Sequence, residues 1–83
     1  MKNEIELKLN SFISTSILKQ PERKLTPEEP IISSGLIDSF SLVDLSVYIE
    51  EEIGVLIDDS ELNSSTFDTI EQLVNLILSR LGE

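Results

Sequence analysis

Large apolar side chains recur at helical spacing in three separate segments, and this periodicity constrains the fold more than any other feature of the chain. Within each segment, steps of three and four residues place the side chains on one face of a helix. The residues are Ile5, Leu9, Phe12, Ile13 and Ile17 in the first segment, Leu42, Leu45, Ile49 and Ile53 in the second, and Ile70, Leu73, Val74, Ile77 and Leu81 in the third. No alternation of apolar and polar residues is long enough to predict a strand, so the sequence favours an all-α fold.

Residues that typically begin and end helices bound these segments. Pro21 ends the first helix because proline cannot continue the backbone hydrogen-bond ladder. Asp38 and Ser39 are both favourable N-cap residues and predict the start of the second helix. Asp68 and Glu71 have the spacing of a capping box and predict the start of the third helix.

Three more apolar residues enlarge the buried face expected for the second helix, and a short helix is expected after it. Phe40, Val43 and Val47 are predicted to widen that face. Residues 58–62 are predicted to form one or two helical turns. The expected fold is a small four-helix bundle, with three main helices, one short helix and a long loop between the first two main helices.

The long loop, residues 20–38, contains three prolines and a glycine but is not expected to be disordered. Apolar residues are spaced through it and can anchor it across the helices. These residues are Leu25, Ile31, Ile32, Leu36 and Ile37. Loops of this length in compact domains are usually functional.

The size of the chain and the residue types that it lacks limit its chemistry. Its 83 residues suffice for one domain, residues 1–83, and leave little volume for a deep catalytic pocket beside a core. It contains no cysteine and no histidine, which excludes disulfides, Cys/His zinc sites and nucleophiles activated by histidine. The chain is therefore expected not to be an enzyme, and its chemistry is expected to depend on partners.

The charge is strongly acidic and unevenly distributed. The chain has six basic and 16 acidic residues, which gives a formal net charge of −10. This charge disfavours nucleic acid and anionic membranes as partners. Residues 25–79 contain twelve acidic residues and no lysine or arginine. Basic protein surfaces are therefore the expected partners, and Arg80 is expected to stabilise the C-terminal end of the last helix dipole.

Membrane and export signals are not recognisable in the sequence. The longest stretch without a charged residue, residues 9–18, is about half the ~20 apolar residues that a membrane-spanning helix requires. The charged start of the chain lacks the apolar centre of a secretory signal. The sequence therefore predicts a cytoplasmic protein without a membrane span.

Two acidic segments can be tested as sites, and neither fits. Residues 58–69 have the length of a calcium-binding loop, but the sixth position is Asn63 instead of glycine and the twelfth is Thr69 instead of a bidentate acid. Residues 50–52 are three consecutive glutamates on a helix face expected to be exposed, where no neighbouring group sets one carboxylate apart from the others for acid–base chemistry. No metal site is predicted.

Ser39 is the most informative polar residue. It lies where a long anchored loop meets the start of the most acidic helix. Most serines at such a position only cap the helix. A helix start also offers free N–H groups and the positive end of the helix dipole, both of which favour a phosphate. Ser39 is therefore a candidate for carrying a phosphate-linked group.

Together these features resemble the acyl carrier protein family. Asp38-Ser39-Phe40 is similar to the family's Asp-Ser-Leu motif, with Phe40 in place of leucine and expected to anchor the loop. The sequence from Phe67 to Ile70 resembles the start of the family's last helix. The apolar stripe and acidic end of the family's second helix are matched by Leu42, Val43, Leu45, Ile49, Glu50, Glu51, Glu52 and Ile53.

The resemblance implies a site and partners. It implies that Ser39 carries 4′-phosphopantetheine, attached from coenzyme A by a phosphopantetheinyl transferase, with Asp38 beside the arm. The arm would hold acyl or aminoacyl groups as thioesters for loading and transfer enzymes. Basic patches on those enzymes would meet Asp44, Glu50 and Glu51, and the carrier would act as a stand-alone monomer.

Two alternatives remain at this stage. The family's fatty-acid members often have an acid two residues after the serine, but here Ser41 occupies that position. The preceding Gly-Leu-Ile also resembles D-alanyl and other specialised carriers, so fatty-acid, lipid and specialised biosynthesis all stay open, with a slight preference for a specialised role. The other class of function is an unmodified acidic helical adaptor that binds a basic protein.

Overall fold

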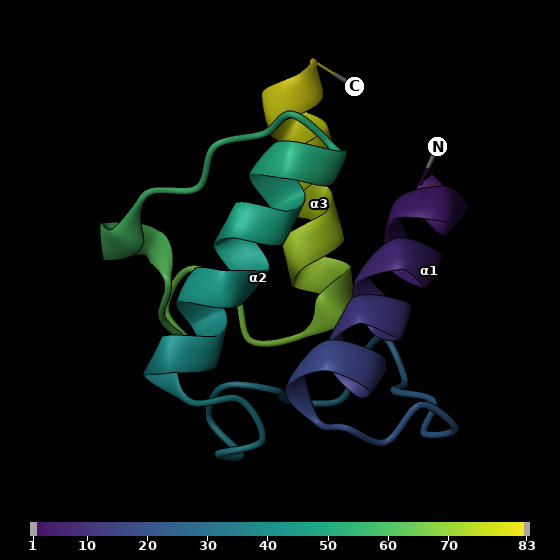
Figure 1. The fold of residues 1–83 in the computed structure, drawn as a ribbon. Coiled ribbons are helices and arrows are strands. Elements are labelled where there is room, and N and C mark those ends of the chain that lie inside the picture. The colour runs from purple at the N-terminus through teal and green to yellow at the C-terminus, as the bar shows by residue number, and fades with distance from the viewer. Residues whose placement is uncertain (1, 83) are drawn as a thin grey trace.

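Three α-helices form the fold of residues 2–82, the part of the chain that this computed structural model describes (Figure 1). They are α1 (Lys2–Phe12), α2 (Ser39–Glu52) and α3 (Ile70–Leu81). A π-helical turn, Ile13–Ile17, continues α1, and a single 3-10 turn, Asp59–Glu61, lies between α2 and α3. The described residues contain no strand, so the all-α prediction is confirmed, and the predicted fourth helix is this 3-10 turn.

The core lies between the three helices and contains the apolar stripes predicted from the sequence. Phe12, Ile17 and Ile53 of these stripes are partly buried against the core, and Leu81 is 37% exposed near the end where α3 reaches past α2 (Figure 1). The buried apolar residues are Ile5, Leu9, Ile13, Leu25, Ile31, Ile37, Leu42, Leu45, Ile49, Val55, Ile57, Phe67, Ile70, Leu73, Val74 and Ile77.

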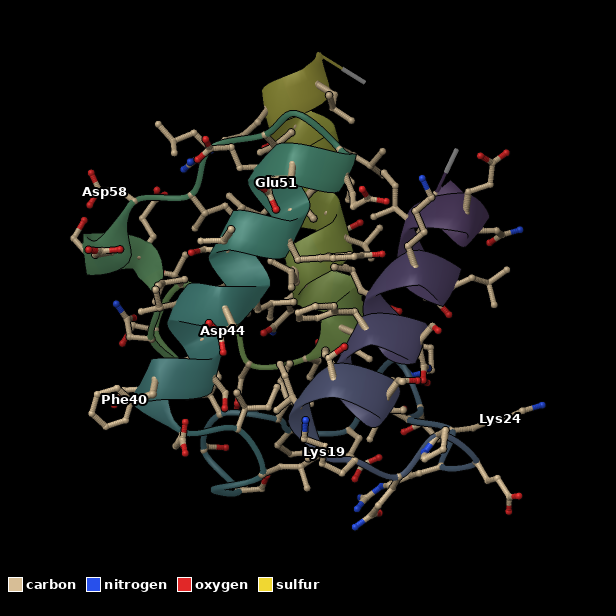
Figure 2. The ribbon with its side chains drawn as sticks, in the orientation of Figure 1. Lys19, Lys24, Phe40, Asp44, Glu51 and Asp58 are labelled. Atoms are coloured by element: carbon tan, nitrogen blue, oxygen red, sulfur yellow. The ribbon has the colours of Figure 1, made fainter. Side chains whose placement is uncertain are left out.

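The prediction that Phe40, Val43 and Val47 widen the buried face of α2 is wrong. These side chains are 84%, 45% and 48% exposed, respectively. Successive residues of an α-helix are rotated by about 100°, so these positions lie about 100° or more around α2 from the buried residue Leu42. For the same reason Phe40 does not anchor the loop. It projects from the first turn of α2 (Figure 2).

The loop between α1 and α2 is packed against the helices, as predicted. Leu25 is buried, and its backbone N–H and C=O both bond to the Asn10 side chain, at 3.3 and 2.6 Å. The hydroxyl of Ser14, which is buried within the π-helical turn, donates to the Arg23 carbonyl at 2.7 Å. Two polar side chains of the first helical segment thus fix the first half of the loop.

α3 begins one residue later than the predicted capping box. Its N-cap is Thr69, whose hydroxyl accepts the Gln72 backbone N–H at 3.1 Å. The side chain of Gln72 in turn accepts the Asp68 backbone N–H at 2.7 Å. Glu71 closes no box, and its backbone N–H donates to the Pro27 carbonyl at 3.1 Å. The carboxylate of Asp68 is left free to bind the long loop.

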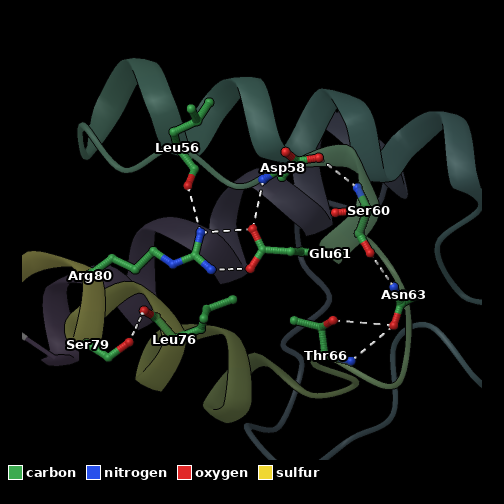
Figure 3. Close-up of polar contacts among 9 residues, drawn as sticks. All are labelled: Leu56, Asp58, Ser60, Glu61, Asn63, Thr66, Leu76, Ser79 and Arg80. Carbon is green, nitrogen blue, oxygen red and sulfur yellow. Dashed lines mark hydrogen bonds and ion pairs between the residues drawn. The ribbon is translucent and has the colours of Figure 1, made fainter.

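Arg80 connects α3 to the segment that follows α2. It donates to the Leu56 carbonyl at 3.0 Å and forms a two-point ion pair with the Glu61 carboxylate (Figure 3). Glu61 also accepts the Asp58 backbone N–H at 3.0 Å, which completes a capping box on the 3-10 turn. The hydrogen bonds from Arg80 lower the pKa of Glu61 below its ordinary value. Glu61 is therefore paired within the chain, as is Glu29, which forms an ion pair with Arg23 at 2.9 Å.

Candidate functional site

Ser39 is the first residue of α2, and its side chain is exposed. Asp38 precedes it as the N-cap, with extended backbone angles and a carboxylate that accepts the Ser41 backbone N–H at 2.8 Å. The Asp38 carbonyl accepts the first helical hydrogen bond, from Leu42 at 3.0 Å. The helix start is therefore fixed by Asp38, and the Ser39 hydroxyl is accessible to another protein.

The electrostatics of the helix start keep Asp38 charged. Hydrogen bonds from the backbone N–H and the hydroxyl of Ser41 lower the pKa of Asp38 below its ordinary value. Asp38 is thus an anion at neutral pH, beside the positive end of the α2 dipole. Because the chain has no histidine, no imidazole base lies beside the Ser39 hydroxyl.

The loop before Ser39 is folded onto the core. The Ile37 backbone N–H donates to the Ile31 carbonyl at 3.0 Å, which closes a short loop, and both isoleucine side chains are buried. Within it, Gly35 has a φ of +80° and donates to the Ile32 carbonyl at 3.0 Å. A side chain at position 35 would be strained by this backbone conformation. Ser39 therefore lies only two residues beyond a well-anchored loop.

The acids assigned to partner binding are all exposed on α2. Asp44 and Glu51 lie on one side of the helix, the side on which Phe40 also projects (Figure 2). Together with Val47 and Tyr48 they border an open hollow of about 280 Å³, which lies between α2 and the end of the first helical segment. Glu50 is exposed but does not border this hollow.

The structure adds an apolar element that the sequence analysis placed in the core. The exposed residues Phe40, Val43 and Val47 form an apolar stripe along α2, beginning directly after Ser39. The signal for this stripe was present in the sequence, because the helical rotation of these positions differs from that of Leu42 and Leu45. The surface beside Ser39 thus combines acidic and apolar side chains.

The described residues form neither a metal-binding cluster nor a membrane-spanning helix. Between residues 2 and 82, no three carboxylates are grouped so that they could hold a metal ion. Asp58, at the start of the segment tested as a calcium loop, instead caps the 3-10 turn by accepting the Ser60 backbone N–H at 3.0 Å. In the same part of the chain, no helix has both the length and the apolar character needed to cross a bilayer.

Comparison with known proteins decides the family. The family described as "Phosphopantetheine attachment site" matches residues 13–77, which include the long loop and all of α2. The acyl carrier protein of Thermotoga maritima is 36% identical over 81 residues, which cover 98% of this chain and 96% of that protein. This chain belongs to the acyl carrier protein family. The acyl carrier protein of Petrotoga mobilis is 34% identical, covering 98% of this chain and 92% of that protein.

A more distant relative is the protein named "Probable acyl carrier protein PigG" from a Serratia species. It is 27% identical over 73 residues, which cover 88% of this chain and 84% of that protein. Acyl carrier proteins are carriers and not catalysts, in agreement with the expectation that this chain has no enzyme activity. Their cofactor is 4′-phosphopantetheine, so the predicted cofactor is confirmed.

The residues of this acyl carrier fit that cofactor. When bound, 4′-phosphopantetheine supplies a thiol for thioester formation, and the chain has no cysteine that could supply one. Ser39 offers an exposed hydroxyl for a phosphodiester, and the free N–H groups of the α2 start favour the phosphate. The anchored loop holds this helix start in place.

Proposed function

We propose that Ser39 carries the 4′-phosphopantetheine of this acyl carrier protein, with Asp38 beside the arm. The observation that carries the proposal is the exposed Ser39 hydroxyl at the first residue of α2, inside the segment that matches the attachment-site family. The loaded carrier would hold acyl or aminoacyl groups as thioesters. It would present them to enzymes of fatty-acid, lipid or specialised acyl biosynthesis.

The attachment step needs a transferase, because the chain itself provides no general base for Ser39. The Ser39 oxygen forms a bond to the phosphorus next to the pantetheine of coenzyme A. The bond from that phosphorus to the adenosine bisphosphate breaks, and a base of the transferase takes the serine proton. Ser39 contributes the accepting oxygen, and α2 orients it.

Partners would dock on α2 beside Ser39. Their basic residues would meet Asp44, Glu50 and Glu51, and their apolar residues would cover the stripe that begins at Phe40. Exposed charges raise the association rate more than the affinity, which suits a carrier that must leave after each step. We expect the carrier to be a monomer, because each partner in turn needs an uncovered α2. We also expect it to act in the cytoplasm.

The preference for a specialised pathway rests on two features. Ser41 occupies the position that is often acidic in fatty-acid carriers, and its N–H serves the Asp38 cap. Gly35, Leu36 and Ile37 resemble the lead-in of D-alanyl and other specialised carriers. Loading of the holo-carrier by candidate acyl- or aminoacyl-activating enzymes, followed by intact mass measurement, identifies the acyl class.

Mass spectrometry tests the attachment site. The wild-type chain, incubated with coenzyme A, Mg²⁺ and a broad-specificity phosphopantetheinyl transferase, should gain the mass of one phosphopantetheine. Ser39→Ala should gain none. Ser41→Ala is the matched control, since it removes a hydroxyl two residues along the same helix, and it should load like the wild type. Loading of Ser39→Ala, or a wild-type chain that stays unmodified, would refute the proposal.

A further inference from the structure

Asp68 binds the loop that leads to Ser39, although the two segments are far apart in the sequence. One oxygen of its carboxylate accepts the backbone N–H groups of Ile32 at 2.9 Å and Ser33 at 2.8 Å. The other oxygen accepts the Ser33 hydroxyl at 2.5 Å. The Asp68 backbone carbonyl accepts a fourth hydrogen bond, from the Ile31 N–H at 2.7 Å. A single residue therefore satisfies three consecutive backbone donors of the loop.

Asp68 is itself held firmly. It directly follows Phe67, whose side chain is 1% exposed. Its own N–H donates to the Gln72 side chain at 2.7 Å. Hydrogen bonds from Ser33 lower the pKa of Asp68, with a larger effect from the hydroxyl than from the backbone N–H. The carboxylate is therefore ionised at neutral pH, and its hydrogen bonds are charge-assisted. The loop is thus anchored to the start of α3.

The rest of the loop transmits this anchor to Ser39. The Ile37 N–H donates to the carbonyl of Ile31, whose own N–H bonds to Asp68, and the Ser34 hydroxyl donates to the Pro30 carbonyl at 2.7 Å. Ser39 follows Ile37 by two residues. The buried side chains of Ile31 and Ile37 also hold this segment, and Asp68 supplies the hydrogen bonds that join residues 31–33 to the start of α3.

We propose that Asp68 is a positioning residue for Ser39, which holds residues 31–37 in the conformation that the phosphopantetheinyl transferase recognises. This inference rests on the proposed attachment at Ser39. A carrier whose recognised conformation is populated only in part binds its partner with an affinity reduced by that fraction. Loss of the Asp68 carboxylate should therefore raise the KM for the carrier and leave kcat unchanged, since the bound complex is the same.

The experiment compares loading kinetics of full-length variants, at a temperature where each variant is folded by circular dichroism. Asp68→Ala removes the carboxylate and should raise the KM for the carrier about threefold to tenfold at unchanged kcat. Asp68→Asn keeps a side-chain acceptor of the same shape and should restore most of the wild-type KM. Amide hydrogen exchange at Ile32 and Ser33 should accelerate in Asp68→Ala, which reports the released loop directly.

Thr69→Ala is the matched control for lost stability. It removes the cap of the same helix, which typically costs about 1 kcal/mol of stability, without touching the long loop. Its Tm should fall while its KM stays at the wild-type value. If Asp68→Ala keeps the wild-type KM, or if Thr69→Ala raises the KM equally, the positioning role is refuted while attachment at Ser39 stands. If the wild type does not load, the proposed attachment and this inference fail together.

Discussion

The aromatic rings of Phe12 and Tyr48 stack with their centroids 4.1 Å apart and their planes 20° apart. Phe12 is the last residue of α1, and Tyr48 lies in the second half of α2, so the pair joins the two helices on the side that carries Asp44 and Glu51. Both rings border the hollow beside these acids. The stack therefore contributes to stability and also fixes the shape of the surface on which partners are proposed to dock.

Replacing Tyr48 by leucine should lower the free energy of unfolding by about 1–2 kcal/mol. A stacked aromatic pair contributes about 0.5–1.5 kcal/mol beyond the apolar area that it buries, and leucine also buries less area. Tyr48→Phe retains the ring and loses only the long hydrogen bond from the hydroxyl to the Lys8 carbonyl, at 3.4 Å, so it should stay within about 0.5 kcal/mol of the wild type. Urea denaturation measures both. Equal losses in the two variants would contradict a role for the stack.

Replacing Phe40 by alanine should leave stability within about 0.5 kcal/mol of the wild type, because its ring is 84% exposed. The same change should weaken transferase docking, since an exposed aromatic ring beside Ser39, the proposed attachment residue, is well placed to fill a partner pocket. Urea denaturation and the KM for loading measure the two effects. Phe67→Ala, in the core, is the contrasting variant and should cost about 3–5 kcal/mol. A large stability loss in Phe40→Ala would show that the ring packs in the fold.

The sequence was sufficient to predict the helices and most of the core. Period and caps are local properties, so the apolar stripes and the start of α2 at Ser39 follow from neighbouring residues. Phe40 was predicted to be buried because its side chain is apolar, but its position around α2 places it on the exposed side of the helix. The cap of α3 was placed at Asp68 instead of Thr69 because both residues are good caps and only the fold shows which one accepts the N–H.

The site was predictable only in part. The place of Ser39 at the start of α2 and the exposure of Asp44 and Glu51 follow from the cap residues and the acidic face. The contact between Ser33 and Asp68 joins residues 35 positions apart, and no local pattern relates two polar residues at that separation. The hollow beside Asp44 and Glu51 likewise needs α1 and α2 to be placed side by side.

The stability contributed by Asp68 should depend on pH. Its pKa is lowered in the folded state by the hydroxyl and N–H of Ser33, so folding favours the ionised form. This stability is fully present above the unfolded pKa of about 3.9 and is lost as the pH falls through the folded value. The stability difference between the wild type and Asp68→Asn should therefore be larger at about pH 7 than at about pH 2.

Urea denaturation across this pH range measures the difference. Ser33→Ala removes one of the three donors to the carboxylate and should give an intermediate profile. Parallel profiles for the wild type and Asp68→Asn would show that the carboxylate gains nothing from folding.

Neutralising Glu51 should weaken transferase docking more than neutralising Glu52, although the two residues are neighbours with the same charge. Glu51 borders the hollow on the proposed docking side, whereas Glu52 borders a different hollow that faces Lys8 and the end of α3. A partner lysine or arginine that enters the first hollow can pack its aliphatic part against Tyr48 and pair with Asp44 or Glu51. A single exposed ion pair contributes about 0.2–1 kcal/mol, which corresponds to an affinity change of up to about fivefold.

The KM for loading should therefore rise about twofold to fivefold in Glu51→Gln and less than about 1.5-fold in Glu52→Gln, at the same ionic strength. The double variant Asp44→Asn with Glu51→Gln should bind the transferase more weakly, and so show a higher KM for loading, than either single variant. The difference between Glu51→Gln and Glu52→Gln should shrink at about 1 M salt, where the screening length is about 3 Å. Equal effects of the two single variants would mean that partners sense only the total charge of α2, and a difference that persists at high salt would mean that the glutamate at position 51 acts through packing instead of charge.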